Sequence, residues 1–321
     1  YNRWNDKYEI TVLFVSVLLV ILYFSNMNKL NQLFPFLFVT LTISTVSFLP
    51  HWLNWNFTGY EGKDEWSEIS SLYDELNNIT SGRIMWEPNP DLNKYGTPMV
   101  LMTIPMFTDH ESVEGLYFDS SITTPFHFVT ISGLAERPSN PVGGLNYING
   151  NFDKGVRHMK QLGVDYFITY TDSISEKATN SNEMEFLFES APFKVFKLNS
   201  SKVELVTSEL INFSQPSFYE RISSSVFQNT LEESFFTLSM KEFQKENNIR
   251  VIDTPSLEEI RNKLSTDEAQ LNITDFEIQN NQIRFRTNQP GKIHLIKVSY
   301  FPNWTIEDGD GPYRITPSFM A

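Results

Sequence analysis

The chain has 321 residues, a formal net charge of -14, 40% hydrophobic residues and no cysteine. A chain of this length and composition buries a sizeable core, and its acidic balance without a basic stripe excludes nucleic-acid binding. The absence of cysteine excludes disulfides, thiol catalysis and cysteine-ligated zinc or iron–sulfur sites.

Two long uncharged stretches predict a transmembrane helical hairpin over residues 1–53. The first, about residues 10–28, holds 19 residues, and a helix of that length rises about 28 Å, the hydrocarbon thickness of a bilayer. The second covers about residues 33–50 and is followed by Trp52 and Trp55, where a membrane interface is expected. A signal peptide and a buried core hairpin are the alternatives, but the first stretch is too long for the apolar core of a signal peptide.

The two predicted spans are antiparallel, because the connection between them is short. Charges beside the spans do not decide which side the flanks occupy. Residues 54–321 hold 22 of the 25 basic and 37 of the 39 acidic side chains. Such an acidic surface favours an extracytosolic location for this domain. Together with the two predicted spans, we expect a multi-pass protein of the cell membrane with its large domain outside the cytosol.

Residues 54–206 are expected to form an extracytosolic α/β subdomain. Apolar residues in 64–78 follow the spacing of an amphipathic helix, and a short strand is predicted at 82–88. The run 98–107 is expected to be a buried strand. A helix ending at Gly163, followed by an apolar strand over 164–170, predicts a helix packed on a sheet. Two short strands near residues 193–206 close this subdomain.

Residues 207–270 are expected to be a mixed helical segment, with an apolar helix face in 231–248. Residues 271–321 then alternate polar and apolar positions between NN, PG and DGDG turns, which predicts a C-terminal antiparallel β subdomain of sandwich type. The fold class is therefore α+β. The chain starts at Tyr1 and stops on an apolar stretch, so we expect both ends to be cut from a longer polypeptide, with a further span after residue 321.

The chemistry-bearing residues form no known catalytic pattern. The five histidines have no metal-ligand spacing, and the DGDG turn at 308–311 lacks the further oxygen ligands of a calcium loop, so no metal and no cofactor are expected. His127, beside a predicted strand end, is the only histidine retained as a candidate. The aromatic residues beside Pro and Gly loops are candidates for stacking on a sugar, with core packing as the alternative: Trp86, Tyr147, Tyr300 and Trp304.

Several segments carry a resemblance to a known family. They are SGRIMWEP, YGT, LGVDYFITYTD and the C-terminal IHLIKVSYFPNWTIEDGDGPYRITPSFMA. Together they resemble the C-terminal extracytosolic region of prokaryotic polytopic membrane proteins described as 6-pyruvoyl-tetrahydropterin synthase-related. These are similar in plan to the YfhO family and to GT-C fold glycosyltransferases. The likeness covers most of residues 10–321.

The resemblance implies sugar transfer from a polyprenyl-phosphate carrier to an envelope glycan, with the outer domain binding acceptor or donor. It places the catalytic acid in a first outer loop upstream of Tyr1, so no catalytic residue is assigned in this chain. The pterin chemistry in the family description would need a zinc-binding histidine triad, which the sequence lacks. The alternative is a non-enzymatic structural or interaction domain of a membrane-anchored envelope complex. A transporter subunit is less favoured, because neither predicted span has an ionisable residue in its interior.

Overall fold

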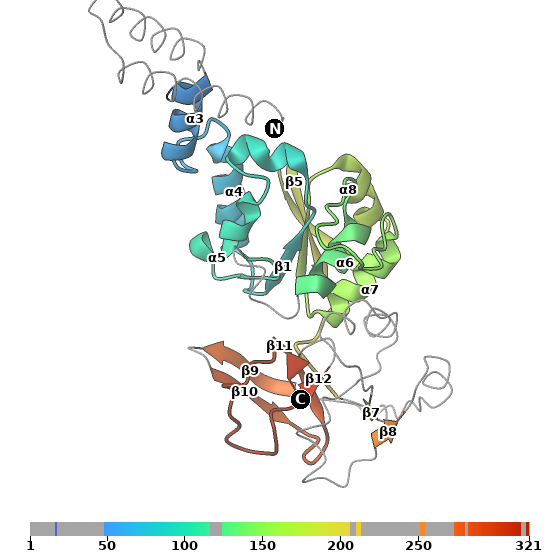
Figure 1. The fold of residues 1–321 in the computed structure, drawn as a ribbon. Coiled ribbons are helices and arrows are strands. Elements are labelled where there is room, and N and C mark those ends of the chain that lie inside the picture. The colour runs from blue at the N-terminus through green and yellow to red at the C-terminus, as the bar shows by residue number, and fades with distance from the viewer. Residues whose placement is uncertain are drawn as a thin grey trace, which may run out of the picture. The chain divides into compact units, whose positions relative to one another are not determined.

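The computed structural model describes residues 17, 48–115, 124–205, 210–212, 251–253, 273–279, 282–315 and 319–320 (Figure 1). The chain forms two compact units, Tyr1–Trp66 and Ser67–Ala321.

The described part of the first unit contains helix α3 (Phe48–Phe57). No helix within the described residues is long and apolar enough to cross a membrane. The ten residues of α3 rise about 15 Å, half the thickness of a hydrocarbon core. The described residues therefore do not support the transmembrane hairpin of the predicted fold class, and its spans over 10–28 and 33–50 lie almost entirely outside them.

The second unit is built on a five-stranded mixed sheet with the order β2-β1-β3-β5-β4. Strand β1 (Arg83–Trp86) runs parallel to both β2 (Glu111–Ser112) and β3 (Tyr166–Thr169). Strands β5 (Phe193–Leu198) and β4 (Met184–Ser190) complete the sheet in antiparallel pairs. This sheet, with both parallel and antiparallel pairs, confirms the α+β class.

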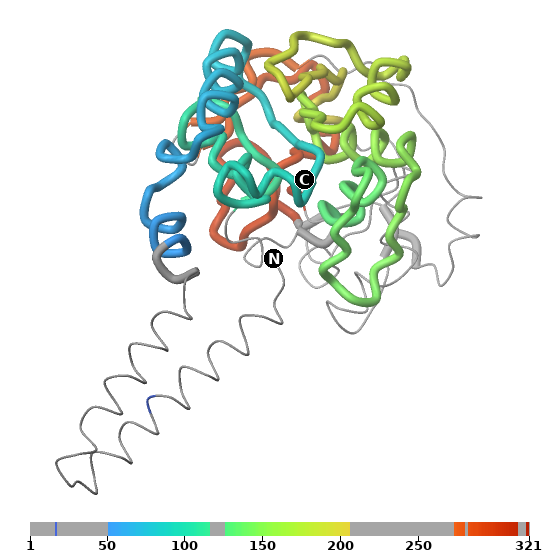
Figure 2. The backbone as a smooth tube through the Cα atoms, turned by 90° about the horizontal axis from the view of Figure 1, so that it is seen from above, coloured from blue at the N-terminus to red at the C-terminus, as the bar shows by residue number. Residues whose placement is uncertain are grey.

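Helices cover both faces of this sheet (Figures 1 and 2). One side carries α4 (Trp66–Leu76), the 3₁₀ helices η2 (Pro90–Tyr95) and η3 (Val100–Thr103), and α5 (Ile104–Phe107). The other carries α6 (Thr124–Leu134), α7 (Phe152–Gln161) and α8 (Asp172–Thr179). The amphipathic helix predicted within 64–78 is confirmed by α4, which buries Ile69, Leu72 and Leu76.

Two apolar runs form helices in the structure and not strands. Residues 98–107 form η3 and α5 instead of the predicted buried strand, since Pro105 lacks the N–H that a central strand needs. Residues around His127 form α6, whose described side chains are buried on all sides. A helix apolar all round lacks the 3.6-residue periodicity that identifies a surface helix.

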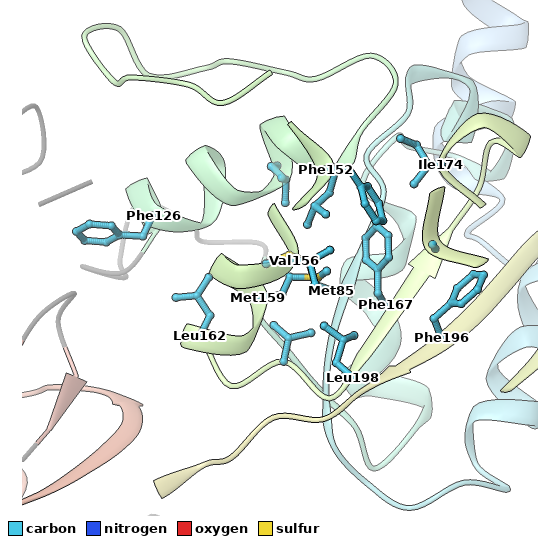
Figure 3. Packing of buried hydrophobic residues seen from close by; sticks show 14 of the residues in the cluster. Met85, Phe126, Phe152, Val156, Met159, Leu162, Phe167, Ile174, Phe196 and Leu198 are labelled. Atoms are coloured by element: carbon cyan, nitrogen blue, oxygen red, sulfur yellow. The ribbon is translucent and has the colours of Figure 1, made fainter. Parts of the chain in front are cut away.

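The main core lies between α6, α7 and the sheet. Figure 3 shows Val156 and Met159 of α7 gathered with Met85 of β1 and Phe167 of β3. Helices α6 and α7 pack closely because position 155 is glycine: a Cβ built there would lie 2.6 Å from Leu134 Cγ.

The C-terminal strands are antiparallel in their pairing, as predicted. A four-stranded sheet has the order β12-β13-β11-β6, with β6 at Val203–Leu205, β11 at His294–Ser299, β12 at Arg314–Ile315 and β13 at Phe319–Met320. Strands β9 (Ile273–Gln279) and β10 (Gln282–Thr287) form a separate antiparallel hairpin. Before this region, β7 (Leu210–Asn212) and β8 (Val251–Asp253) form a parallel pair. The helix predicted over 231–248 lies outside the described residues.

Buried cations connect the amino end of β1 to strand β11. The Arg83 guanidinium Nη1 donates to the carbonyls of Leu162 and Lys297, both at 2.7 Å. The Lys297 ammonium, 1% exposed, donates to the Lys160 carbonyl at 2.8 Å and forms an ion pair with Glu204. Burial lowers the pKa of Lys297, because the charged ammonium is desolvated. These bonds satisfy carbonyl groups at the end of α7.

Candidate functional site

The carboxyl ends of the parallel strands β1, β2 and β3 meet at one edge of the sheet. In open α/β sheets, ligands bind beyond the carboxyl ends of the strands. Polar residues follow each strand here: Glu87 and Asn89 after β1, Glu114 after β2, and Tyr170 after β3. We call this group, with the residues that contact it, the carboxyl-edge cluster.

Glu87 is a buried carboxylate that holds the start of α8. Its side chain, in a residue 1% exposed, accepts hydrogen bonds from the backbone N–H groups of Tyr170 and Thr171, both at 2.9 Å, and from the Thr171 hydroxyl at 2.8 Å. Thr171 is the N-cap of α8. A negative charge at a helix N-terminus is stabilised by the helix dipole and by charge-assisted hydrogen bonds. Glu87 therefore ties the end of β1 to the end of β3.

Asn89 presents a buried donor at the same edge. The residue is 2% exposed, and its Oδ1 accepts from the Asp91 N–H at 2.9 Å to cap η2. Its Nδ2 has no hydrogen-bond partner among the described residues. Leaving a buried donor unpaired costs about 1–3 kcal/mol, so such groups call for a specific reason.

Ionisable and aromatic side chains form the outer part of the cluster. The Glu68 carboxylate accepts hydrogen bonds from Lys94 Nζ, at 2.7 Å, and from the Tyr95 hydroxyl. Burial alone would raise the pKa of Glu68, but these two bonds outweigh it and lower the pKa. Tyr95 and Tyr170 both contact the ring of Phe193, with centroids 5.8 and 5.6 Å away. Burial raises the pKa of Tyr170, so its phenol stays neutral.

Glu114 and His127 form a buried pair beside β2. Glu114 Oε2 lies 3.5 Å from His127 Nε2, and the two side chains are 11% and 4% exposed. Burial raises the pKa of Glu114 to about 7 and lowers the pKa of His127 to about 3. Desolvation disfavours both charges. Near pH 5 the pair is therefore a neutral carboxylic acid beside a neutral imidazole and not an ion pair.

The structure brings two of the sequence candidates to this edge. Trp86 is the last residue of β1 and is 3% exposed, and His127 lies in the first turn of α6. The Tyr147 hydroxyl donates to the Val142 carbonyl at 2.8 Å and accepts from the Val142 N–H at 2.9 Å. Tyr300 and Trp304 follow β11, in the C-terminal part of the unit.

The sequence candidates do not include Glu87, Asn89, Glu114 or Tyr170. The available signal was positional, since each polar residue follows a short strand by one to three residues. No group of three or more His, Asp and Glu side chains suited to a metal ion occurs within the described ranges. Comparison of the chain with known proteins does not identify a related site, because no family model, curated protein or solved structure matches the chain.

Proposed function

We propose that the α/β part of this chain binds an envelope glycan acceptor or a lipid-linked sugar donor in a cell-envelope glycosyltransferase-like protein. The observation that carries the proposal is the carboxyl-edge cluster, where the unpaired Asn89 amide lies after the same strand as Glu87. Sugar hydroxyls both donate and accept hydrogen bonds. An amide donor, the Glu68 carboxylate and the Tyr170 hydroxyl supply complementary groups.

No catalytic residue is assigned in this proposal. The resemblance gives no catalytic residue to carry over to this chain, so we propose binding as the role of the described residues. The domain would work outside the cytosol, beside the cell membrane, as its acidic charge favours.

Contact with a lipid surface is part of the proposal. Helix α3 contains no charged residue. Trp52 is 42% exposed and Phe57 is 83% exposed. Exposed aromatic rings are typical of segments at the membrane–water interface.

A non-enzymatic interaction domain is the second candidate function. The packing of three sequence candidates favours it, because Trp86 and His127 are each 3% exposed and the Tyr147 hydroxyl is engaged within its own loop. These side chains have internal structural partners, as in a domain that acts through its surface.

The test compares glycan binding by the purified chain and three variants, using saturation-transfer NMR and calorimetry with oligosaccharides released from the host envelope. Asn89→Ala removes the unpaired donor and should weaken binding about tenfold, the effect of one hydrogen bond from a buried group. Tyr170→Phe should weaken it a few-fold. Glu183→Gln, which changes an exposed carboxylate paired with Lys160, is the matched control.

Two results would separate the candidate functions. Binding reduced in Asn89→Ala and unchanged in Glu183→Gln supports the glycan-binding domain. No measurable glycan binding, together with unchanged envelope sugar after deletion of the gene and a stable co-purifying partner, would favour the interaction domain.

A further inference from the structure

Strand β4 forms an outer edge of the five-stranded sheet. It is the last strand in the order β2-β1-β3-β5-β4, and β5 is its only strand partner in the described part of the chain. Glu185 and Glu189 are exposed, and Phe186 is 49% exposed. An edge strand presents backbone N–H and C=O groups that can pair with another strand. Proline and lysine, which often protect such edges, are absent from β4.

The edge is held in a fixed conformation by the rest of the hairpin. Strands β4 and β5 are joined by only two residues, 191 and 192, and β5 is anchored by Phe193 and Phe196, both 0% exposed. The ring of Phe186 packs edge-on against Phe196, with the centroids 5.7 Å apart. A pre-ordered strand loses little conformational entropy when a partner adds to it.

The charges on β4 select the kind of partner. Within the hairpin, Glu185 lies opposite Lys197 and Glu189 lies opposite Lys194. An antiparallel second copy of β4 centred on Leu187 would instead place Glu185 opposite Glu189, and like charges directly opposite each other are destabilising. The strand therefore disfavours self-pairing in this register and favours a positively charged strand.

We propose that the outer edge of β4 binds an extended basic segment of a partner protein, which adds to the sheet as a sixth strand. Strand β5 shows how basic residues must be spaced to pair with β4. The two glutamates of β4 are four residues apart, but Lys194 and Lys197 opposite them are only three apart. The difference arises because the register shifts between Phe186 and Phe188. The partner segment would carry two basic residues in the same spacing, with an apolar residue next to one of them to cover Phe186. The chain's net charge of -14 would steer such a segment toward it.

The test uses a fluorescein-labelled peptide, Thr-Thr-Lys-Val-Phe-Lys-Thr-Thr, and measures its binding to the full chain by fluorescence anisotropy. Replacing both lysines of the peptide by glutamate should abolish binding. The double variant Glu185→Lys/Glu189→Lys should weaken binding of the basic peptide about tenfold, from two cross-strand pairs, and should gain binding to the acidic peptide. The control Asp74→Lys/Glu75→Lys, exposed on α4, makes the same change in net charge and should bind the basic peptide nearly as well as the wild type.

Backbone pairing has its own readout. A basic peptide N-methylated at alternate residues keeps its charges but loses its strand hydrogen bonds, and should bind at least tenfold more weakly than the unmodified peptide. Hydrogen exchange should slow at β4 amides when the unmodified peptide is bound. Equal binding of both peptides, equal loss in the α4 control, or a dimer of the chain that forms through β4 would each overturn the proposal.

Discussion

The Glu114–His127 pair should give the free energy of unfolding a pH dependence that two single substitutions separate. Both groups are neutral when buried, but their ordinary pKa values in the unfolded chain are 4.5 for the glutamate and 6.5 for the histidine. Stability falls with pH wherever the folded state binds more protons than the unfolded state, and rises with pH where it binds fewer.

The two effects have opposite signs. Folded Glu114 keeps its proton up to a pKa of about 7, so stability falls as pH rises from 4.5 toward 7, by about 1.4 kcal/mol per pH unit and about 3 kcal/mol in all. Folded His127 stays neutral down to a pKa of about 3, so stability is lost as pH falls from 6.5 toward 3, at about the same slope. Between pH 4.5 and 6.5 the two slopes cancel, and the pair contributes a nearly flat profile.

Urea unfolding followed by circular dichroism, at half-unit steps from pH 4 to 7.5, measures these slopes. With Glu114→Gln only the histidine effect remains, so stability should rise with pH between 4.5 and 6.5. With His127→Gln only the glutamate effect remains, so stability should fall over the same range. The double variant should restore the flat profile, and Glu183→Gln, at an exposed carboxylate, should match the wild type.

The wild-type profile alone does not separate a neutral pair from an ion pair, because the folded pair holds one proton in either case. The single variants carry the test. Stability that does not rise with pH in Glu114→Gln, or does not fall with pH in His127→Gln, between pH 4.5 and 6.5 would refute the assignment of a neutral pair.

Three further substitutions test other contacts. Gly155→Ala should lower the free energy of unfolding by about 1–3 kcal/mol through overpacking against Leu134, and calorimetry should show a lower Tm; an unchanged Tm would contradict the close approach of α6 and α7. Glu87→Gln should cost about 1.5–3 kcal/mol, since it weakens the charge-assisted bonds at the start of α8, and amide exchange in α8 should accelerate, whereas an effect confined to other elements would contradict this role. Lys297→Met should cost about 1–3 kcal/mol by removing the ion pair with Glu204 and the hydrogen bond to the Lys160 carbonyl, as measured by urea unfolding, and a variant as stable as the wild type would argue against these contacts.

Local sequence patterns predicted the elements whose residues face two environments. Helix α4 has one buried and one exposed face, so Ile69, Leu72 and Leu76 recur at helical spacing. The helix before Gly163 and the strand after it were also predicted from the sequence. Gly163 adopts a positive φ of 67° that few other residues tolerate, so a glycine at this position marks the end of the helix.

The run 98–107 was predicted as a buried strand but forms η3 and α5, in which Met106 is 77% exposed and Phe107 is 37% exposed. The described side chains of α6 are buried on all sides and show no period, and periodicity alone does not separate a buried helix from a buried strand. The candidate site was missed for a related reason. Glu87 contacts residues 83 and 84 positions later in the chain, because β1 pairs with β3. Glu114 contacts His127 of α6. Tertiary packing, and not a local pattern, therefore brings these groups together.

The pairing of β6 with β11 has a consequence for synthesis on the ribosome. Strand β6 ends at Leu205 and β11 begins at His294, so the first strand emerges several seconds before its partner at about 5–20 residues per second. During that interval the five-stranded sheet can form, but the Arg83 side chain has no access to the Lys297 carbonyl, and β6 has an open side. A chaperone that shields this strand while residues 206–299 are being made would raise the yield of folded protein, whereas rare codons placed between the two strands would lower it.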